Sequence, residues 1–152
     1  MDVDVQLVVP RRLASVRREV VAGEVGSAWR PALDLVWAFV RTQPGLWTDG
    51  HNVFVYHHST DAPLRCEFGV EVTRTFDPAG EVYPTETPAG EAAVAVHRGS
   101  YDLTEAYDAI TRWMASNDRE PAGHSWEIYG DPTPDPAGNE TTVFQLLRPR
   151  QP

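Results

Sequence analysis

The clearest fold signals of this chain lie in residues 91–129, EAAVAVHRGSYDLTEAYDAITRWMASNDREPAGHSWEIY. The first residues of this stretch alternate between two faces and predict a β-strand over 91–97. Apolar residues then recur at steps of three and four, which is the period of an amphipathic helix. Asp102 and Glu105 have the spacing of a capping box and predict where this helix begins. A second strand is predicted over Ser125–Tyr129, so the stretch forms a strand-helix-strand unit.

The same order of elements is predicted before this stretch. Pro31 falls inside the earlier helical pattern, so that helix either starts late or kinks there. The segment 77–90 is rich in Pro and Gly and predicts the connection between two halves. The remaining expected elements are a half-buried strand over 3–9, a strand over 13–20, a helix over 24–40, strands over 52–57 and 64–73, a loop over 131–138 and a last strand over 141–147.

Short matches between the halves indicate an internal repeat. Ala28-Trp29 aligns with Ala106-Tyr107, and the segment 53–56 aligns with 126–129. We therefore expect an α+β fold in which two pseudo-symmetric β-α-β-β units form a mostly antiparallel sheet, with two helices on one side. The length of 152 residues suits one domain over 1–152, with halves of approximately 1–76 and 88–152.

Composition limits the classes of partner. Apolar residues make up 41% of the chain and charged residues 23%, which is typical of a globular domain. The formal net charge is −9, and a protein that binds nucleic acid needs a basic surface, so we expect no direct nucleic-acid partner. No apolar run reaches the roughly 18 to 20 residues that span a bilayer, and the N-terminus has no signal-peptide pattern. We therefore expect no membrane partner and a cytoplasmic location.

Several kinds of chemistry lack their sequence signatures. The five histidines show no HxxxH or HEXXH spacing, and Cys66 is alone, so neither a CxxC metal motif nor an internal disulfide can form. Glycine-rich phosphate loops and the GxSxG turn of serine hydrolases are missing as well. We expect no metal and no cofactor.

Glu127 is the most unusual residue of the pattern. In its strand, Trp126 and Ile128 share one face, whereas Glu127 shares the other face with Tyr129. If the Trp126 face packs under the helices, Glu127 lines whatever the opposite face encloses; alternatively, it is a carboxylate on a solvated sheet. The matching position of the first half is Phe54, so only one half carries this charge. A carboxylate between aromatic residues suits a cationic ligand.

The other aromatic residues fall into two groups. Helical spacing predicts core positions for Trp29, Tyr107 and Trp113. Tyr56, Tyr101 and Tyr129 lie instead at strand ends or at a helix entrance, where a phenol can border a cleft.

The segments 88–101, Glu127-Ile128-Tyr129 and Asp131-Pro132 resemble the GyrI-like small-molecule-binding family. Domains of this family also serve as the effector-binding part of AraC- and MerR-type regulators, and the segments 68–72 and 142–147 fit it too. The resemblance implies a SOUL-like fold with a ligand cleft at the pseudo-symmetry axis. It implies that a strand glutamate binds aromatic or lipophilic cations. The candidate ligand-binding residues are Glu127, Tyr129, Tyr101, Tyr56, Phe54 and Phe68.

Two main functions follow from this resemblance. The first is a stand-alone small-molecule-binding protein that acts as a sensor or sequesters its ligand. We expect no helix-turn-helix within the 152 residues, so a regulatory role would need a protein partner. The alternative is a hydrolase of reactive cyclopropane-bearing xenobiotics in which Glu127 and Tyr129 supply acid and base. A protein-interaction module and, by fold analogy alone, a haem binder are further hypotheses.

Overall fold

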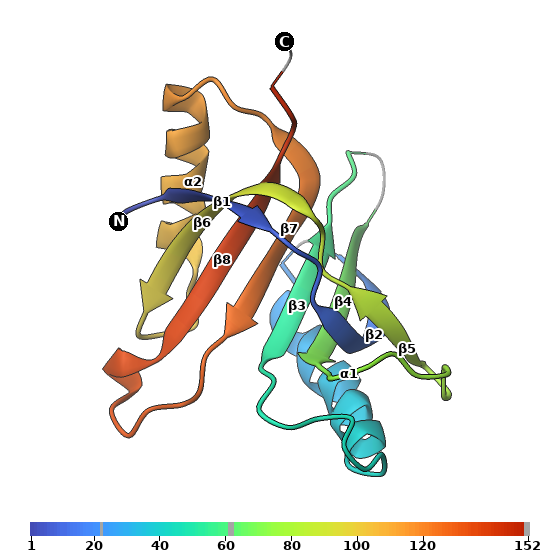
Figure 1. The fold of residues 1–152 in the computed structure, drawn as a ribbon. Helices are drawn as coiled ribbons and strands as arrows, with labels where there is room; N and C mark the ends of the chain where they lie inside the picture. Colours follow the sequence, from blue (N-terminus) through green and yellow to red (C-terminus); the bar gives the residue numbers. More distant parts are fainter. Residues whose placement is uncertain (22, 61–62, 151–152) are drawn as a thin grey trace.

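A computed structural model describes residues 1–21, 23–60 and 63–150 of the chain (Figure 1). These residues form one eight-stranded sheet and two α-helices, with a short 3-10 helix at Pro136–Gly138. The helices are α1 (Val25–Val40) and α2 (Thr104–Ser116). The strands are β1 (Asp4–Val8), β2 (Arg12–Val20), β3 (Asn52–His57), β4 (Leu64–Glu71), β5 (Val82–Glu86), β6 (Gly90–Arg98), β7 (Pro121–Tyr129) and β8 (Glu140–Leu147).

The strand order shows an internal pseudo-twofold symmetry. The sheet runs β1-β6-β8-β7-β3-β4-β2-β5, and each neighbouring pair is antiparallel. If β1-β2-α1-β3-β4 is exchanged with β5-β6-α2-β7-β8, the order reads the same in reverse. The pseudo-axis therefore passes between the two central strands, β3 and β7. The predicted α+β fold with a mostly antiparallel sheet is confirmed.

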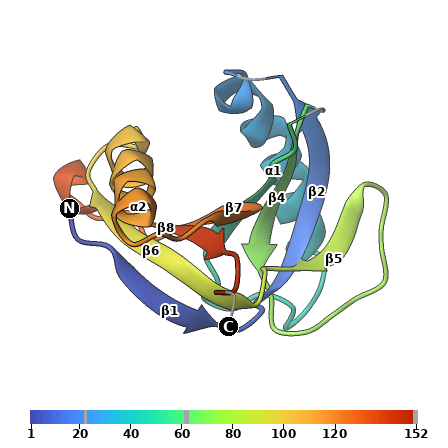
Figure 2. The ribbon, with the colours of Figure 1, turned by 90° about the horizontal axis from the view of Figure 1, so that it is seen from above.

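Strand register places both helices on one face of the sheet. Glu127 of β7 lies opposite Phe54 of β3 on one side and opposite Val143 of β8 on the other, so the three side chains share a face. Phe54 belongs to the hydrophobic cluster formed with α1, and Val143 belongs to the cluster formed with α2. Figure 2 shows the two helices on the same side of the sheet. The helices thus cover the Glu127 face, so the condition considered for the sequence, with the Trp126 face under the helices, is not met.

The opposite face has its own apolar cluster. Trp126 is 2% exposed and stacks on Phe144, with ring centroids 5.1 Å apart and an interplanar angle of 2°. Side chains from β2, β3 and β6 complete this cluster. Since neighbouring residues of a strand point to opposite faces, a slip of one residue would exchange Trp126 and Glu127 between them. Burial of Trp126 therefore helps to hold Glu127 on the helix face.

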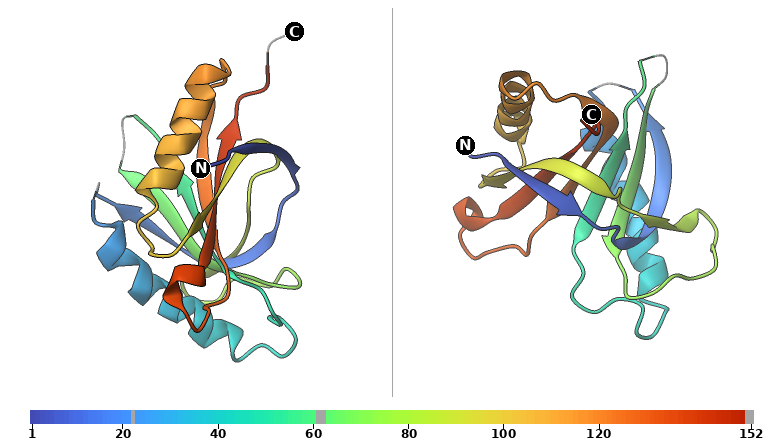
Figure 3. Two further views of the ribbon diagram at one scale, coloured as in Figure 1. Left: turned by 90° about the vertical axis from the view of Figure 1, so that its left-hand side faces the viewer. Right: turned by 45° about the horizontal axis from the view of Figure 1, so that its top comes forward.

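Both edge strands differ from the expectations. The loop predicted over 77–90 contains β5, which pairs with β2, and its Pro84 is tolerated because β5 is an edge strand. The first strand was expected to be half-buried, yet Leu7 is 82% exposed and Val5 is 41% exposed. The physical reason is that β1 lies at the other edge, where it pairs with β6 alone (Figure 3). Each half thus contributes the strand at the edge of the other half: β1 pairs with β6, and β5 pairs with β2.

The helix boundaries also differ in detail. Helix α1 begins at Val25 and runs through Pro31, so a late start of this helix is wrong. The capping box predicted for α2 does not form, because the N-cap is Leu103, one residue later than expected. The Asp102 carboxylate instead accepts hydrogen bonds from the backbone N–H of Thr104 at 3.1 Å and from its hydroxyl at 2.7 Å. No helix in the described part of the chain has the length and apolar character needed to cross a bilayer.

Candidate functional site

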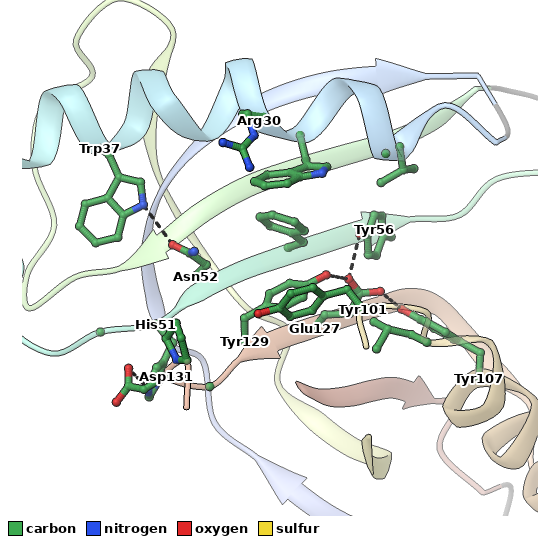
Figure 4. A pocket seen from close by; sticks show the side chains of 18 of the residues that line it. Arg30, Trp37, His51, Asn52, Tyr56, Tyr101, Tyr107, Glu127, Tyr129 and Asp131 are labelled. Atoms are coloured by element: carbon green, nitrogen blue, oxygen red, sulfur yellow. Dashed lines mark hydrogen bonds and ion pairs between the residues drawn. The ribbon is translucent and has the colours of Figure 1, made fainter. Parts of the chain in front are cut away.

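A cavity of about 910 Å³ lies on the helix face of the sheet. It is bounded by α1 on one side, by the start of α2 on the other, and by the central strands β3 and β7 (Figure 4). The cavity therefore lies on the pseudo-twofold axis of the fold, which passes between β3 and β7. The lining comprises Val25, Gly26, Trp29, Arg30, Trp37, Trp47, Gly50, His51, Asn52, Phe54, Tyr56, Tyr101, Leu103, Thr104, Tyr107, Asp108, Glu127, Tyr129, Gly130, Asp131 and Pro132.

The carboxylate of Glu127 lies at this cavity and accepts hydrogen bonds from three tyrosine hydroxyls. Tyr56 and Tyr129 both donate to its Oε1, at 3.0 and 2.5 Å, and Tyr107 donates to Oε2 at 2.5 Å. Glu127 is only 5% exposed. Figure 4 shows the hydroxyls converging on this group from β3, β7 and α2. The arrangement holds one carboxyl group in a fixed orientation inside an aromatic site.

Burial governs the ionisation of this cluster. Removal from water raises the pKa of Glu127 above its ordinary value, although the three tyrosine hydroxyls act in the opposite direction by stabilising the carboxylate. Burial and the neighbouring carboxylate raise the pKa values of Tyr56, Tyr107 and Tyr129 well above that of a free phenol. The tyrosines therefore remain neutral hydrogen-bond donors. The carboxyl group is the member of the cluster that can gain or lose a proton.

Local sequence patterns bring these groups to one place. Tyr129 follows Glu127 by two residues and shares its face of β7. Tyr56 stands two residues after Phe54, the cross-strand partner of Glu127, so it also shares that face. Tyr107 is in the first turn of α2, where its neighbour Ala106 packs against the sheet. Three separate elements therefore contribute one hydroxyl each.

Aromatic rings form the wall beside the carboxylate. Phe54 packs against Tyr129 with ring centroids 4.9 Å apart, and Trp29 of α1 packs against Phe54 at 5.9 Å. Tyr101 covers Tyr129 at 5.9 Å and is itself 60% exposed. These rings offer faces and edges to a flat apolar ligand.

The other end of the cavity is polar and carries indole rings. Trp37 donates its ring N–H to the side-chain oxygen of Asn52 at 3.1 Å, and Trp47 packs edge-on against Trp37 at 5.0 Å. His51 Nε2 lies 3.3 Å from a carboxylate oxygen of Asp131, and the Asp131 side chain is 89% exposed. The cavity thus has a buried acidic end and an open polar end.

The structure brings together five of the six predicted ligand-binding residues. Phe68 is the exception, because it is fully buried in β4 behind Phe54 and lies outside the cavity lining. Its placement in the candidate site is therefore corrected: it supports Phe54 through an edge contact at 4.9 Å. The five that line the cavity are Glu127, Tyr129, Tyr101, Tyr56 and Phe54.

Tyr107 is the main residue that sequence reasoning missed. Its helical spacing predicts a core position, but its hydroxyl donates to Glu127. The internal repeat carried a usable signal, since Tyr107 aligns with Trp29, and only the tyrosine has a hydroxyl to direct at the sheet. A phenol at a helix position facing a buried carboxylate is a hydrogen-bond donor as well as an apolar side chain.

The histidines lie mostly away from the cavity. His57 contacts His124 through their Nδ1 atoms at 2.9 Å and Glu67 through its Nε2 at 2.7 Å, whereas His58 contacts Ser125 at 2.8 Å. The adjacent residues His57 and His58 therefore have different partners. Among the described residues, no three His, Cys, Asp or Glu side chains are arranged to hold a metal ion.

Solved structures share this fold. The C-terminal domain of EcmrR superposes with a TM-score of 0.78, 21% identity and 97% coverage of both chains. SAV2435 bound to tetraphenylphosphonium gives a TM-score of 0.74 at 9% identity, covering 97% of this chain and 94% of that one. A hydrolase encoded by lin2189 from Listeria innocua gives 0.68 at 11% identity, covering 96% and 91%. No match was found among curated protein sequences.

The sequence itself carries the family assignment. A family profile described as the GyrI-like small molecule binding domain matches residues 1–144 of the 152. The match includes both helices, the central strands and the first five of the eight residues of β8. The cavity and its carboxylate lie at the axis that relates the two halves. The chain belongs to the GyrI-like small-molecule-binding family.

Proposed function

We propose that this protein binds aromatic or lipophilic cations in the cavity between α1 and α2. The observation that carries the proposal is the carboxyl group of Glu127, which is 5% exposed and surrounded by tyrosines. A buried carboxylate is costly unless it is paired, and here its partners are neutral hydroxyls. A cation that enters the cavity supplies the missing positive charge.

The aromatic wall supports the same class of ligand. A cation held over the face of a Tyr or Trp ring gains about 0.5 to 2 kcal/mol when it is removed from water. Tyr129 donates to Glu127 and is covered by Tyr101, and Trp29 and Phe54 extend the aromatic surface from there. A delocalised charge on a flat aromatic frame matches such a surface better than a small, strongly hydrated ammonium ion. The cavity of about 910 Å³ leaves room for a ligand of several rings.

A binding role of this kind suits a sensor or a sequestering protein. The formal net charge of −9 disfavours direct contact with nucleic acid, so a regulatory role would act through a protein partner. The acidic surface also attracts cationic ligands over distances of about a Debye length.

The test compares two ligands of one shape on two proteins. The ligands are an aryl quaternary ammonium and its neutral isostere, in which carbon replaces the charged nitrogen. Glu127→Gln keeps the shape of the side chain and removes its charge. We expect the Kd of the cation to rise at least about ten-fold, which corresponds to ~1.4 kcal/mol, whereas the Kd of the isostere stays the same. Isothermal titration calorimetry measures both.

A matched control removes a buried carboxylate elsewhere. Glu67 on β4 is 7% exposed and lies outside the cavity lining, so Glu67→Gln should leave the Kd of both ligands unchanged. Equal losses for the cation and the isostere in Glu127→Gln would mean general damage to the site. No loss for either ligand would contradict the proposal.

The second candidate function is hydrolysis, and the hydrogen-bonded carboxyl group favours it. Because burial raises the pKa of Glu127, this group can hold a proton and give it to the ring carbon that is released when a strained C–C bond breaks. Water adds to the other carbon of that bond and returns a proton to Glu127, and Tyr129 at 2.5 Å stabilises the carboxylate in between. The family resemblance implies a strained cyclopropane ring as a substrate. Mass spectrometry of such a compound after incubation would reveal addition of water. Loss of turnover in Glu127→Gln, with the Kd of a neutral analogue retained, would support this function.

A further inference from the structure

Arg30 places a positive charge on the wall of the same cavity. It lies on α1 next to Trp29 and lines the cavity together with it. Its guanidinium sits over the Trp29 ring, 5.0 Å from the centroid, and Figure 4 shows it on the α1 side, away from Glu127. This cation–π contact holds the guanidinium beside the cavity without neutralising it.

No carboxylate of the described residues pairs with this guanidinium. The ion pairs of arginine in this part of the chain involve six other residues: Arg11, Arg17, Arg18, Arg98, Arg119 and Arg148. Within the same described residues, no side-chain hydrogen bond engages Arg30 either. Arg30 therefore retains its hydrogen-bond donors for another molecule. A site for purely cationic ligands gains nothing from such a group.

The two opposite charges are separated by aromatic surface. From Arg30, the Trp29 ring leads to Phe54 at 5.9 Å, and Phe54 leads to Tyr129 at 4.9 Å. Tyr129 then donates its hydroxyl to Glu127 at 2.5 Å. A flat ligand that covers these rings has the carboxylate of Glu127 near one of its ends and the guanidinium of Arg30 near the other.

We propose that Arg30 is an anion-binding subsite and that the preferred ligands are zwitterions, namely aromatic cations that also carry a carboxylate. Guanidinium groups bind carboxylates through two parallel N–H···O hydrogen bonds, which gives this end of the ligand a defined orientation. The cationic centre then lies beside Glu127. This inference rests on the proposed function, because it assigns the second pole of the same ligand.

The test uses a matched pair of probes. One is an N-(biphenylmethyl)pyridinium with a carboxylate on its far ring, and the other is the methyl ester of that compound. The two probes share the cation and the aromatic body, and they differ by a single negative charge. Quenching of tryptophan fluorescence reports binding, since Trp29, Trp37 and Trp47 line the cavity.

Arg30→Gln should separate the two probes. We expect the Kd of the carboxylate probe to rise roughly five-fold, the effect of an exposed charge pair worth about 1 kcal/mol. The Kd of the ester should stay the same or fall, because the variant removes a repulsive charge. Arg41→Gln is the matched control: Arg41 follows the same helix and covers Trp37 at 5.7 Å, but it lies outside the cavity lining. It should leave the ratio of the two Kd values unchanged.

The outcomes distinguish this inference from the proposed function. If Arg30→Gln and Arg41→Gln change the ratio equally, or neither changes it, the Arg30 subsite is wrong. The proposed function still holds in that case, provided that Glu127→Gln weakens both probes. If neither probe binds the wild-type protein, the proposed function itself fails.

Discussion

The two central strands β3 and β7 occupy equivalent positions across the pseudo-twofold axis, yet they carry different chemistry. Phe54 of β3 and Glu127 of β7 face each other directly in the sheet. Around them, the equivalent residues Tyr56 and Tyr129 both donate to the same carboxylate oxygen. The symmetry of the backbone thus places two equivalent tyrosine hydroxyls as donors. The acceptor is present because one half has Glu127 at the axis where the other half has Phe54.

The two helices show the same contrast. Trp29 of α1 and Tyr107 of α2 occupy equivalent positions, and each contacts the central residue of its own half. Trp29 packs on Phe54 with ring centroids 5.9 Å apart, while Tyr107 donates to Glu127 at 2.5 Å. One half therefore forms an apolar wall and the other a polar cluster. The repeat places a cavity at its axis, and departures from the repeat give the two sides of this cavity different chemistry.

The largest effect on stability is expected from a variant that makes the two halves alike at the axis. Phe54→Glu puts a second carboxylate directly opposite Glu127, with Cβ atoms about 4.5 to 5.5 Å apart. We expect the free energy of unfolding to fall by at least about 4 kcal/mol at pH 8, because the ring is lost and two buried like charges repel. Urea denaturation followed by circular dichroism measures the loss.

The control for this variant is Phe54→Leu, which removes the ring without adding a charge. It should cost about 1 to 2 kcal/mol at any pH. The penalty of Phe54→Glu should shrink at pH 5, since protonation relieves the repulsion. A penalty that does not change with pH would mean that the two side chains avoid each other.

A second prediction concerns the pH dependence of stability. Burial raises the pKa of Glu127, so the folded protein keeps a proton that the unfolded chain has already released. The free energy of unfolding should therefore fall as the pH rises from the ordinary glutamate pKa through the raised one, by up to about 1.4 kcal/mol per pH unit. Urea denaturation of wild type and Glu127→Gln at a series of pH values isolates this contribution as the difference between the two curves.

Other groups contribute with the opposite sign. The pKa of Glu67 is lowered by its contacts with His57 and Arg17 against the effect of burial, and burial lowers the pKa values of His58 and His124. These shifts make the protein more stable as the pH rises, and they are common to both proteins. If the curves of wild type and Glu127→Gln are parallel throughout, the carboxyl group does not hold a proton in the folded state.

The equivalent tyrosines allow a finer comparison. Tyr129→Phe and Tyr56→Phe each remove one hydroxyl that donates to the carboxylate, so each should raise the pKa of Glu127 further. The shift should be about one unit for Tyr129, whose bond is 2.5 Å, and smaller for Tyr56 at 3.0 Å. Carboxyl ¹³C NMR titration reads these values directly. A larger shift for Tyr56→Phe would contradict the order of the two bonds.

The smallest effect is expected at Tyr101, which has no equivalent contact with the carboxylate. Its side chain covers Tyr129 and is 60% exposed. Tyr101→Phe should change the free energy of unfolding by less than about 0.5 kcal/mol and leave the pKa of Glu127 unaltered. Tyr101→Ala should weaken an aromatic ligand about three-fold through loss of a ring face. Thermal unfolding and ligand titration measure the two quantities, and a change in the carboxyl titration would contradict this separation.

Much of the fold could be predicted because its signals are local. The alternation over Ser125–Tyr129 correctly separates the face of Trp126 from that of Glu127, and the cap predicted at Asp102 lies one residue before the N-cap of α2. The repeat of elements predicts the pseudo-symmetry. Edge strands were harder to predict: β5 contains Pro84, and β1 alternates like a half-buried strand although Leu7 remains exposed.

The candidate site depended more on tertiary structure. Five of the predicted residues line the cavity because each shares the helix face of the central strands or lies at the entrance to α2. Phe68 fails this test, since α1 covers its strand and Phe54 stands in front of it. Tyr107 was missed because helical spacing cannot tell a core position from one that reaches a buried carboxylate.

Local sequence patterns are enough to predict which residues share a face, where the helices lie along the chain, and that one half carries a carboxylate where the other has Phe54. These features depend on periods of two and 3.6 residues, and neighbours in the chain are enough to set them. The face that the helices cover and the hydroxyls that meet Glu127 depend instead on how the elements pack in three dimensions. The contact of that carboxylate with Tyr56 joins residues 71 positions apart, so it exists only after the two halves pack around their common axis. Its contact with Tyr107 joins residues 20 positions apart within the second half, and it exists only after α2 packs against the sheet.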